Sequence, residues 1–192
     1  MLSLSCFLPC LLLGGVLGAP LGCASAPNPI EREIAKSPKD QLTVVEFVDY
    51  RCNHCQTMFD VLAPTLDLHT GRVRVVIKHV PLGKHPGARQ AAEAAVCAEE
   101  QGKLEPFHKA LMEGASVGDD EVLTLAQHAG LNTEEFKSCL RSDTPKDRLA
   151  DDLEEWEASG GDGLPMIFIG RQKFVGVVDI AHIEAALKDE MP

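Results

Sequence analysis

Basic residues are scarce in this sequence. Its 192 residues include 29 Asp and Glu but only 18 Lys and Arg, which leaves a formal net charge of −11 at pH 7. Proteins that bind the phosphate backbone usually present a basic patch, because most of their affinity comes from neutralised phosphates. The composition therefore excludes nucleic acid as an expected partner.

A long hydrophobic run is also missing. A membrane-spanning helix needs about 20 apolar residues, whereas the run from Phe7 to Gly18 is interrupted by Pro9, Gly14 and Gly15. Hydrophobic residues make up 45% and charged residues 24% of the chain, close to the average of soluble globular domains. A chain of this length and composition indicates one folded domain with a sizeable insertion, expected as a monomer, rather than a disordered or multi-span membrane protein.

The N-terminal segment has no charged side chain in residues 1–22. Its short apolar core has the length of a signal-peptide h-region, so we predict an export signal over 1–22. The segment from Met1 to Ser5 lacks the usual Lys or Arg, and an N-terminal anchor that stays attached is the alternative. The prediction places the folded domain in the bacterial periplasm or cell envelope.

Two processing sites are compatible with this leader. Cleavage after Ala24-Ser25-Ala26 follows the small-residue pattern, but Pro27 comes next. Leu21-Gly22-Cys23 resembles the lipobox of bacterial lipoproteins, which would put a lipid anchor on Cys23. Cys6 and Cys10 leave with the leader in either case.

The pattern of the remaining chain predicts an α/β fold. Residues 23–40 are rich in Pro, Lys and Glu without an apolar stripe and are expected to form a tether, so the fold begins at Gln41. A buried strand over Leu42 to Val48, a helix over Cys52 to Thr70 kinked at Pro64, and a strand over Val73 to Val80 form a parallel crossover unit. The two parts of the core are thus 41–80 and 164–192.

The second part of the core contains a hairpin and a closing helix. Met166 to Ile169 and Phe174 to Val177 flank Gly170-Arg171-Gln172, and an amphipathic pattern covers Ile180 to Lys188. Residues 81–163 form a helical insertion, with candidate helices over Ala88 to Gln101, Glu105 to Glu113, Asp120 to His128, Thr133 to Leu140 and Pro145 to Ala158.

The chemistry concentrates at Cys52-Asn53-His54-Cys55, where the first strand passes into the first helix. A helix N-terminus favours a thiolate, so Cys52 is the candidate exchanging sulfur. Cys55, one turn further, can close a ring with Cys52 and release a mixed disulfide. The imidazole of His54 can stabilise the Cys52 thiolate, which would make the disulfide a better oxidant.

A metal site is the alternative for this pair. A structural zinc needs four ligands, but no second Cys-x-x-Cys follows and the histidines of the chain show no paired spacing. We therefore expect neither a metal nor another cofactor. A metal-binding redox carrier remains as a non-enzymatic alternative.

Four further motifs accompany the cysteine pair: Val44-Val45-Glu46-Phe47-Val48-Asp49-Tyr50, Lys78-His79-Val80-Pro81-Leu82, Ala95-Val96-Cys97-Ala98-Glu99-Glu100-Gln101-Gly102-Lys103 and Gly163-Leu164-Pro165-Met166-Ile167-Phe168-Ile169-Gly170. With them the chain resembles the DsbA family of thioredoxin-like proteins over nearly its whole mature length. The resemblance implies a thioredoxin-like fold with an inserted helical domain.

The resemblance also implies roles for individual residues. Pro165 would be a cis proline that faces the cysteine pair, and Leu164 and Asn53 would line the substrate groove. Asn53 stands where the best-known members have proline, and Leu164 where Thr or Val is more usual. Glu46 would be the acid below the active site that moves the proton of Cys55, with a pKa raised by burial; an edge-strand Glu that reaches solvent is the alternative.

The remaining cysteines, Cys97 and Cys139, lie on the apolar sides of predicted helices. In an oxidising compartment they are expected to form a structural disulfide, with two separate buried thiols as the alternative. His108, His128 and Trp156 are interpreted as packing or surface residues. The acidic run from Asp151 to Glu157 is interpreted as a solvated face.

These observations predict an exported thiol-disulfide oxidoreductase that forms disulfides in reduced or misoxidised client proteins. A membrane or soluble redox partner would recycle its active site. A disulfide reductase or isomerase is the enzymatic alternative.

Overall fold

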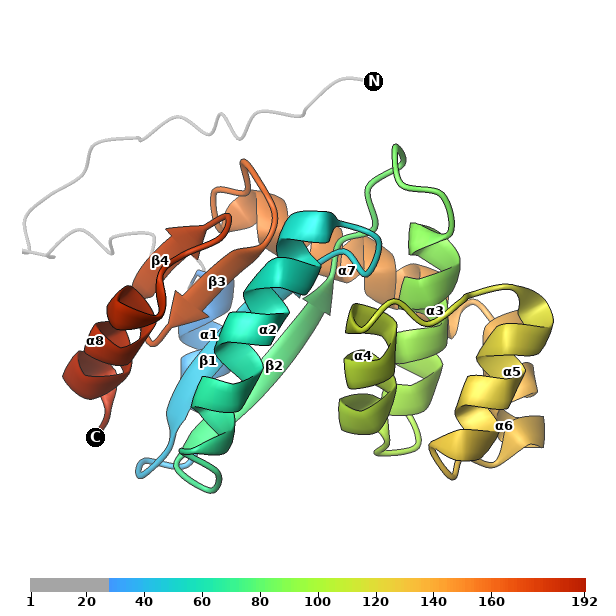
Figure 1. The fold of residues 1–192 in the computed structure, drawn as a ribbon, viewed down its shortest axis with the longest axis horizontal. Coiled ribbons are helices and arrows are strands. Elements are labelled where there is room, and N and C mark those ends of the chain that lie inside the picture. Colours follow the sequence, from blue (N-terminus) through green and yellow to red (C-terminus); the bar gives the residue numbers. More distant parts are fainter. Residues whose placement is uncertain (1–27) are drawn as a thin grey trace, which may run out of the picture.

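The computed structural model describes residues 28–192 of the chain (Figure 1). The predicted export signal over 1–22, its two cysteines and the candidate lipidation site Cys23 lie outside the described residues. Within 28–192, no helix is long and apolar enough to cross a membrane.

A four-stranded sheet forms the centre of the fold, in the order β2-β1-β3-β4. The strands are β1 (Leu42–Val48), β2 (Val73–His79), β3 (Met166–Ile169) and β4 (Gln172–Val175). β1 is parallel to β2 and antiparallel to β3, and β4 is antiparallel to β3. The crossover from β1 to β2 runs through α2 (Asn53–Asp67), as the crossover pattern of the sequence predicts.

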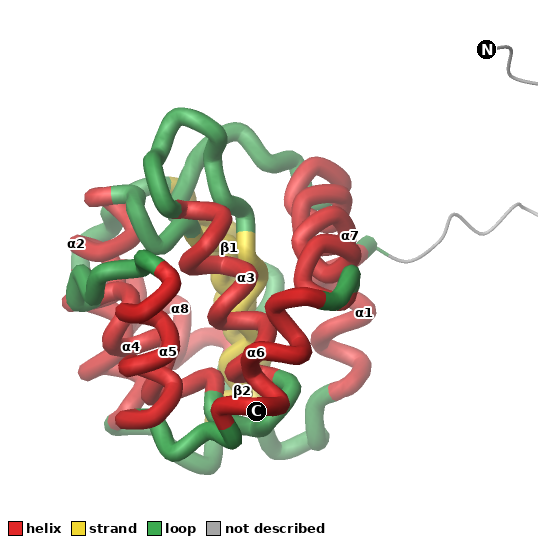
Figure 2. Tube along the Cα trace, turned by 90° about the vertical axis from the view of Figure 1, so that its right-hand side faces the viewer, coloured by secondary structure: helices red, strands yellow, loops and turns green. Residues whose placement is uncertain are grey.

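Helices cover both faces of this sheet (Figure 2). α2 and α8 (Ile180–Glu190) pack on one face, and α1 (Pro29–Lys36) and α7 (Thr144–Ala158) pack on the other. β1 lies in the middle and is buried along its whole length, so its β-branched residues contribute to both layers of the core. The α/β class predicted from the sequence is confirmed.

Four more helices follow β2 and lie beside the sheet (Figure 1). They are α3 (Ala88–Glu99), α4 (Leu104–Met112), α5 (Asp119–His128) and α6 (Thr133–Arg141). α3 is the central one, because it contacts α4, α5, α6 and α7. All the helices predicted for residues 81–163 are present, and only their ends differ.

The prediction of a tether over 23–40 is wrong for residues 29–36, because they form α1. The Asn28 side chain accepts a hydrogen bond from the Ile30 N–H at 2.8 Å and so caps the helix N-terminus. Ile30 is buried in the core, and Glu33 is 4% exposed. Ile34, one turn after Ile30, also packs against the core, but two apolar residues in a short helix with four charged residues gave only a weak pattern in the sequence.

Charged contacts hold α1 against the sheet. Glu33 accepts hydrogen bonds from Arg74 at 3.0 Å and Lys36 at 2.7 Å. Lys78 of β2 lies 3.7 Å from Glu33 and 2.6 Å from Glu155. Burial opposes the charge on the Glu33 carboxylate, but the hydrogen bonds from Lys36 and Arg74 outweigh it and lower the pKa of Glu33.

The acidic face of α7 is not fully solvated, contrary to the prediction. Asp152 is completely buried, accepts the His79 backbone N–H at 2.8 Å and lies 3.3 Å from the Lys78 ammonium. Arg148 donates to the other Asp152 oxygen at 3.0 Å. Asp152 therefore pairs with a backbone N–H at the end of β2, and its charge neutralises the buried Lys78. Both interactions depend on a strand that is far from Asp152 in the sequence.

Candidate active site

The two active-site sulfurs occupy different positions at the start of α2. Cys52 is the N-cap residue, and its N–H donates to the Asp49 carbonyl oxygen at 3.1 Å. Cys52 is 9% exposed and Cys55 is 2% exposed, and both are free thiols. Unpaired N–H groups and the positive end of the helix dipole stabilise a thiolate at the N-cap. Cys52 is thus the more exposed of the two cysteines.

Cys55 is the more deeply buried of the two cysteines, and its thiol resists ionisation. Its Sγ accepts the Asp49 backbone N–H at 3.5 Å. Burial raises the pKa of the Cys55 thiol far above its ordinary value, and the neighbouring Cys52 raises it further. A buried thiol of this kind stays protonated unless a base removes its proton while it reacts.

Asn53 and His54 lie between these cysteines and are exposed. Their positions in the first turn of α2 direct them to solvent. His54 makes no hydrogen bond or ion pair with the residues of 28–192. Its stabilisation of the Cys52 thiolate therefore stays a prediction.

The loop before β3 contains the other residues implied by the family resemblance. The Leu164–Pro165 peptide bond is cis, and the Pro165 carbonyl oxygen accepts the Gly176 N–H at 2.8 Å. Leu164 is 8% exposed and belongs to the same buried cluster as Cys52 and Cys55. A client groove lined by Leu164 and Pro165 stays a prediction.

Glu46 is a buried carboxyl group without a partner. It lies in β1 opposite Ile77 of β2 and Ile167 of β3, and it is 7% exposed. No described residue gives it a hydrogen bond or an ion pair. Burial raises the pKa of Glu46 from its ordinary 4.5 to about 7. This carboxyl group can therefore both take up and release a proton near neutral pH.

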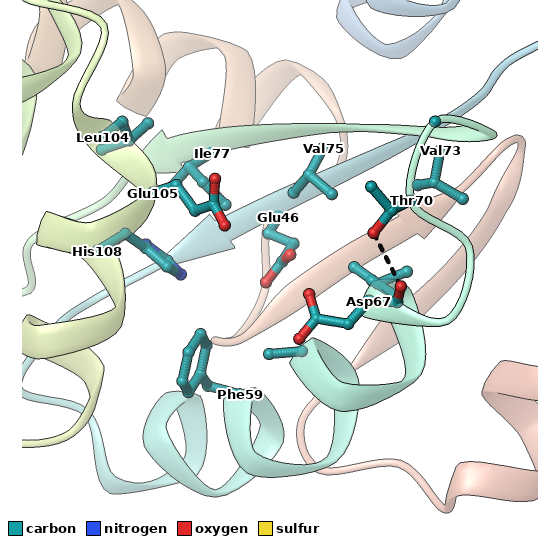
Figure 3. A pocket seen from close by; sticks show the side chains of 13 residues that line it. Glu46, Phe59, Asp67, Thr70, Val73, Val75, Ile77, Leu104, Glu105 and His108 are labelled. Carbon is teal, nitrogen blue, oxygen red and sulfur yellow. Dashed lines mark hydrogen bonds between the residues drawn. The ribbon is translucent and has the colours of Figure 1, made fainter.

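The Glu46 side chain points into a cavity between α2 and α4 (Figure 3). The cavity has a volume of about 390 Å³. Its walls are mostly apolar, and its polar side chains are Glu46, Asp67, Thr70, Glu105 and His108.

Asp49 was not predicted as a site residue, although it directly follows β1. One carboxylate oxygen accepts the Arg51 N–H at 2.7 Å. The other accepts the Leu82 N–H at 2.8 Å and lies 2.8 Å from His85 Nδ1. Asp49 thus connects the end of β1, the cysteine turn and the loop after β2, and it holds the turn that presents Cys52.

Tyr50 and two histidines form a second group that the sequence did not reveal. The Tyr50 hydroxyl lies 3.3 Å from His79 Nδ1 and 3.1 Å from His108 Nδ1. All three side chains are buried. One histidine on a helix gives no spacing signal, and the sequence pattern indicates only a packing or surface residue at His108. The fold brings His108 to Tyr50 and to the cavity of Glu46.

Cys97 and Cys139 lie outside the active site. They form a disulfide between α3 and α6 with an S–S distance of 2.00 Å. Among residues 28–192 no cluster of three or more His, Cys, Asp or Glu side chains is arranged to hold a metal ion.

The sheet order, the cysteine pair at the start of α2 and the cis Leu164–Pro165 bond define a thioredoxin-like fold with a Cys-x-x-Cys pair. The sequence profile of the thioredoxin family matches residues 37–189, and the chain belongs to this family. A thioredoxin-like oxidoreductase from Silicibacter pomeroyi is 30% identical, with 79% of this chain and 87% of that chain covered and a TM-score of 0.68.

Two more distant structures share the fold. The thiol-disulfide exchange protein alpha-DsbA2 from Wolbachia pipientis is 17% identical, with a TM-score of 0.72 and 83% and 91% of the two chains covered. BdbD from Bacillus subtilis is 22% identical, with a TM-score of 0.70 and 81% and 90% covered. Both are similar to this chain in fold.

A curated relative of a different kind is the Na(+)/H(+) antiporter NhaA 3 from Salinispora tropica. It is 29% identical over 177 residues, which are 90% of this chain but 27% of the relative. The chain thus spans about a quarter of the length of the curated relatives that it matches.

Proposed function

We propose that this protein is an exported oxidase that introduces disulfides into reduced client proteins. The difference between its two sulfurs carries the proposal. Cys52 lies at a helix N-cap, where a thiolate is stabilised, whereas Cys55 is deeper and its thiol has a strongly raised pKa. One sulfur is thus suited to exchange with clients and the other to resolution.

In the proposed reaction a client thiolate attacks Cys52 Sγ in the oxidised pair. The Cys52–Cys55 bond breaks, a client–Cys52 disulfide forms, and Cys55 leaves with the electron pair and takes a proton. A second client thiolate then attacks the client sulfur, and Cys52 leaves as a thiolate. The client has lost two electrons to the cysteine pair, which a membrane or soluble redox partner must oxidise again.

Glu46 would serve as the acid and base for Cys55. Its pKa of about 7 lets it give a proton to the leaving Cys55 thiolate and recover it in the reverse step. Leu164 and Pro165 would hold the client chain, and Asn53 would border it. His54 would favour the Cys52 thiolate and so make the pair more oxidising.

Two observations support export. The Cys97–Cys139 disulfide is of a kind that persists outside the cytosol. A neighbour of similar fold, 23% identical, is a periplasmic thioredoxin-like protein from Salmonella enterica serovar Typhimurium. The leader over residues 1–22, with or without a lipid on Cys23, would deliver the chain to that compartment.

Replacement of each cysteine by serine tests the assignment of roles. Cys52→Ser should abolish exchange with a dithiol peptide. Cys55→Ser, incubated with a peptide that contains a disulfide, should accumulate a mixed disulfide: Cys52 displaces one peptide sulfur as a thiolate, and the resolving thiol is gone. Gel analysis without reductant would show this adduct. The assignment is wrong if the Cys55→Ser protein forms no adduct while Cys52→Ser still turns over.

The reduction potential decides between oxidation and reduction. A value near −120 mV is expected for an oxidase, whereas a value near about −270 mV would indicate a reductase. Equilibration of the native cysteine pair with glutathione buffers gives this value.

A further inference from the structure

Tyr50, His79 and His108 form one hydrogen-bonded chain that begins two residues before Cys52. The Tyr50 oxygen lies 3.3 Å from His79 Nδ1 and 3.1 Å from His108 Nδ1. Burial lowers the pKa of both histidines to about 3. Each ring is therefore neutral at physiological pH and carries one N–H.

The protons of this chain can be assigned. His79 Nε2 is buried and has no hydrogen-bond partner. A buried N–H without an acceptor is rarer in proteins than an unused acceptor, so His79 carries its proton on Nδ1 and donates it to the Tyr50 oxygen. The Tyr50 hydroxyl then donates to His108 Nδ1. It follows that His108 carries its own proton on Nε2.

His108 belongs to the wall of the cavity that contains Glu46. The His108 ring extends from α4 into this cavity, toward the Glu46 carboxyl group (Figure 3). Both side chains are 7% exposed, and no direct hydrogen bond joins them. A cavity of about 390 Å³ with a donor and an acceptor that lack partners has the room and the polarity to hold bridging water.

No other side chain that lines the cavity among the described residues is a free hydrogen-bond donor for the Glu46 carboxyl group. Among the described residues that line the cavity there is no lysine or arginine. The Thr70 hydroxyl donates to the Asp67 carbonyl oxygen at 2.8 Å. The charged groups that face Glu46 are Asp67 of α2 and Glu105 of α4, both exposed, while β2 and β3 present Ile77 and Ile167.

We propose that His108 is a positioning residue for Glu46. Its Nε2–H donates, through water in the cavity, to the Glu46 carboxylate, and this cavity is the route between Glu46 and solvent for the proton of Cys55. This inference rests on the proposed function. Tyr50 and His79 take part by keeping the His108 proton on Nε2.

The proton balance applies to resolution of a mixed disulfide. Cys55 gives its proton to Glu46 as its sulfur attacks Cys52, the Cys52–Cys55 bond forms, and the client sulfur leaves as a thiolate. Glu46 then passes the proton to the cavity water and so to solvent. No oxidant or reductant is needed beyond the cysteine pair and the client.

The direct test measures the protonation of Glu46 in the full oxidised protein, in which Cys52 and Cys55 do not titrate. The carboxyl infrared band or the ¹³C shift of Glu46 is followed against pH. His108→Phe removes the donor and should raise the pKa of Glu46 by about 1, a tenfold change in proton affinity. His108→Gln keeps an N–H at this place and should restore the native value in large part.

The matched control is His128→Phe, because His128 is exposed on α5 and does not line the cavity. It should leave Glu46 unchanged. If His108→Phe does not fold, His108→Met is measured instead, since methionine adapts to irregular gaps and also lacks a donor. An unchanged Glu46 pKa in the donor-free variant, with or without lower stability, would overturn the inference.

A kinetic arm separates this inference from the proposed function. Release of a peptide from its mixed disulfide with Cys52 is followed against pH in the native protein and in the His108→Phe variant. The pH midpoint of release should move upward with the pKa of Glu46. If the native protein shows no exchange at all, the proposed function fails; if exchange is normal and the midpoint does not move, the role of His108 fails alone.

Discussion

Glu46 should make the stability of this protein fall as the pH rises through the acid range. Its pKa is about 7 in the folded protein against an ordinary value of 4.5. Below pH 4.5 both states are protonated, and the group contributes nothing. Between 4.5 and 7 the unfolded chain ionises while the folded protein keeps its proton, so folding becomes less favourable; above 7 the difference is constant.

The magnitude follows from the same two values. Each pKa unit corresponds to about 1.4 kcal/mol, so the difference between about 7 and 4.5 amounts to about 3 kcal/mol. Glu46→Gln has nearly the same shape but does not titrate. Relative to the native protein, the variant should therefore gain about 3 kcal/mol in free energy of unfolding between pH 4 and pH 8.

Urea unfolding of the reduced proteins at a series of pH values measures this gain. Other titrating groups are common to the two proteins and cancel in the difference. Glu105→Gln is the matched control, because Glu105 lines the same cavity but is exposed, and its difference from the native protein should stay nearly constant. A Glu46→Gln difference that does not grow with pH would refute the burial of an unpartnered carboxyl group.

Two further predictions concern His54 and the disulfide. His54→Ala should lower the reduction potential of the cysteine pair by tens of millivolts, since loss of about 1.4 kcal/mol of thiolate stabilisation corresponds to about 30 mV; glutathione equilibration measures it, and an unchanged potential would leave His54 as a spacer. Cys97→Ala with Cys139→Ala opens a loop with a sequence separation of 42 and should lower the free energy of unfolding by about 4 kcal/mol. A loss below about 1 kcal/mol in urea unfolding would contradict a stabilising role for this bond.

The sequence predicted the elements whose pattern is local. β1 is a run of β-branched residues buried on both faces, and β3 is a short apolar run that ends at a glycine with φ 55°, where the chain turns. The Cys-x-x-Cys pair could be placed at a helix start because strand and helix patterns meet there. Such signals need only neighbouring residues, so they can be read without the fold.

The sequence did not predict which charged side chains are buried in ion pairs. Asp152 and Glu155 belong to an acidic run that is typical of a solvated helix face, yet both approach Lys78. Glu33 joins α1 to β2 through Arg74 and Lys78, in addition to the apolar contacts that Ile30 and Ile34 make with the core. Whether a charge is solvated or paired depends on its partner in space, and these partners come from other segments of the chain.

The sequence by itself predicted the nucleophile Cys52, its resolving partner Cys55 and the acid Glu46 six residues before Cys52, because one strand and the turn that follows it contain all three. Only the tertiary structure decided that Glu46 shares a cavity with His108 and that no cation among the described residues lines that cavity. It also decided that Tyr50 lies between two neutral histidines from β2 and α4. The physical reason is that burial and hydrogen bonding depend on groups that meet only after the helical segment has packed against the sheet.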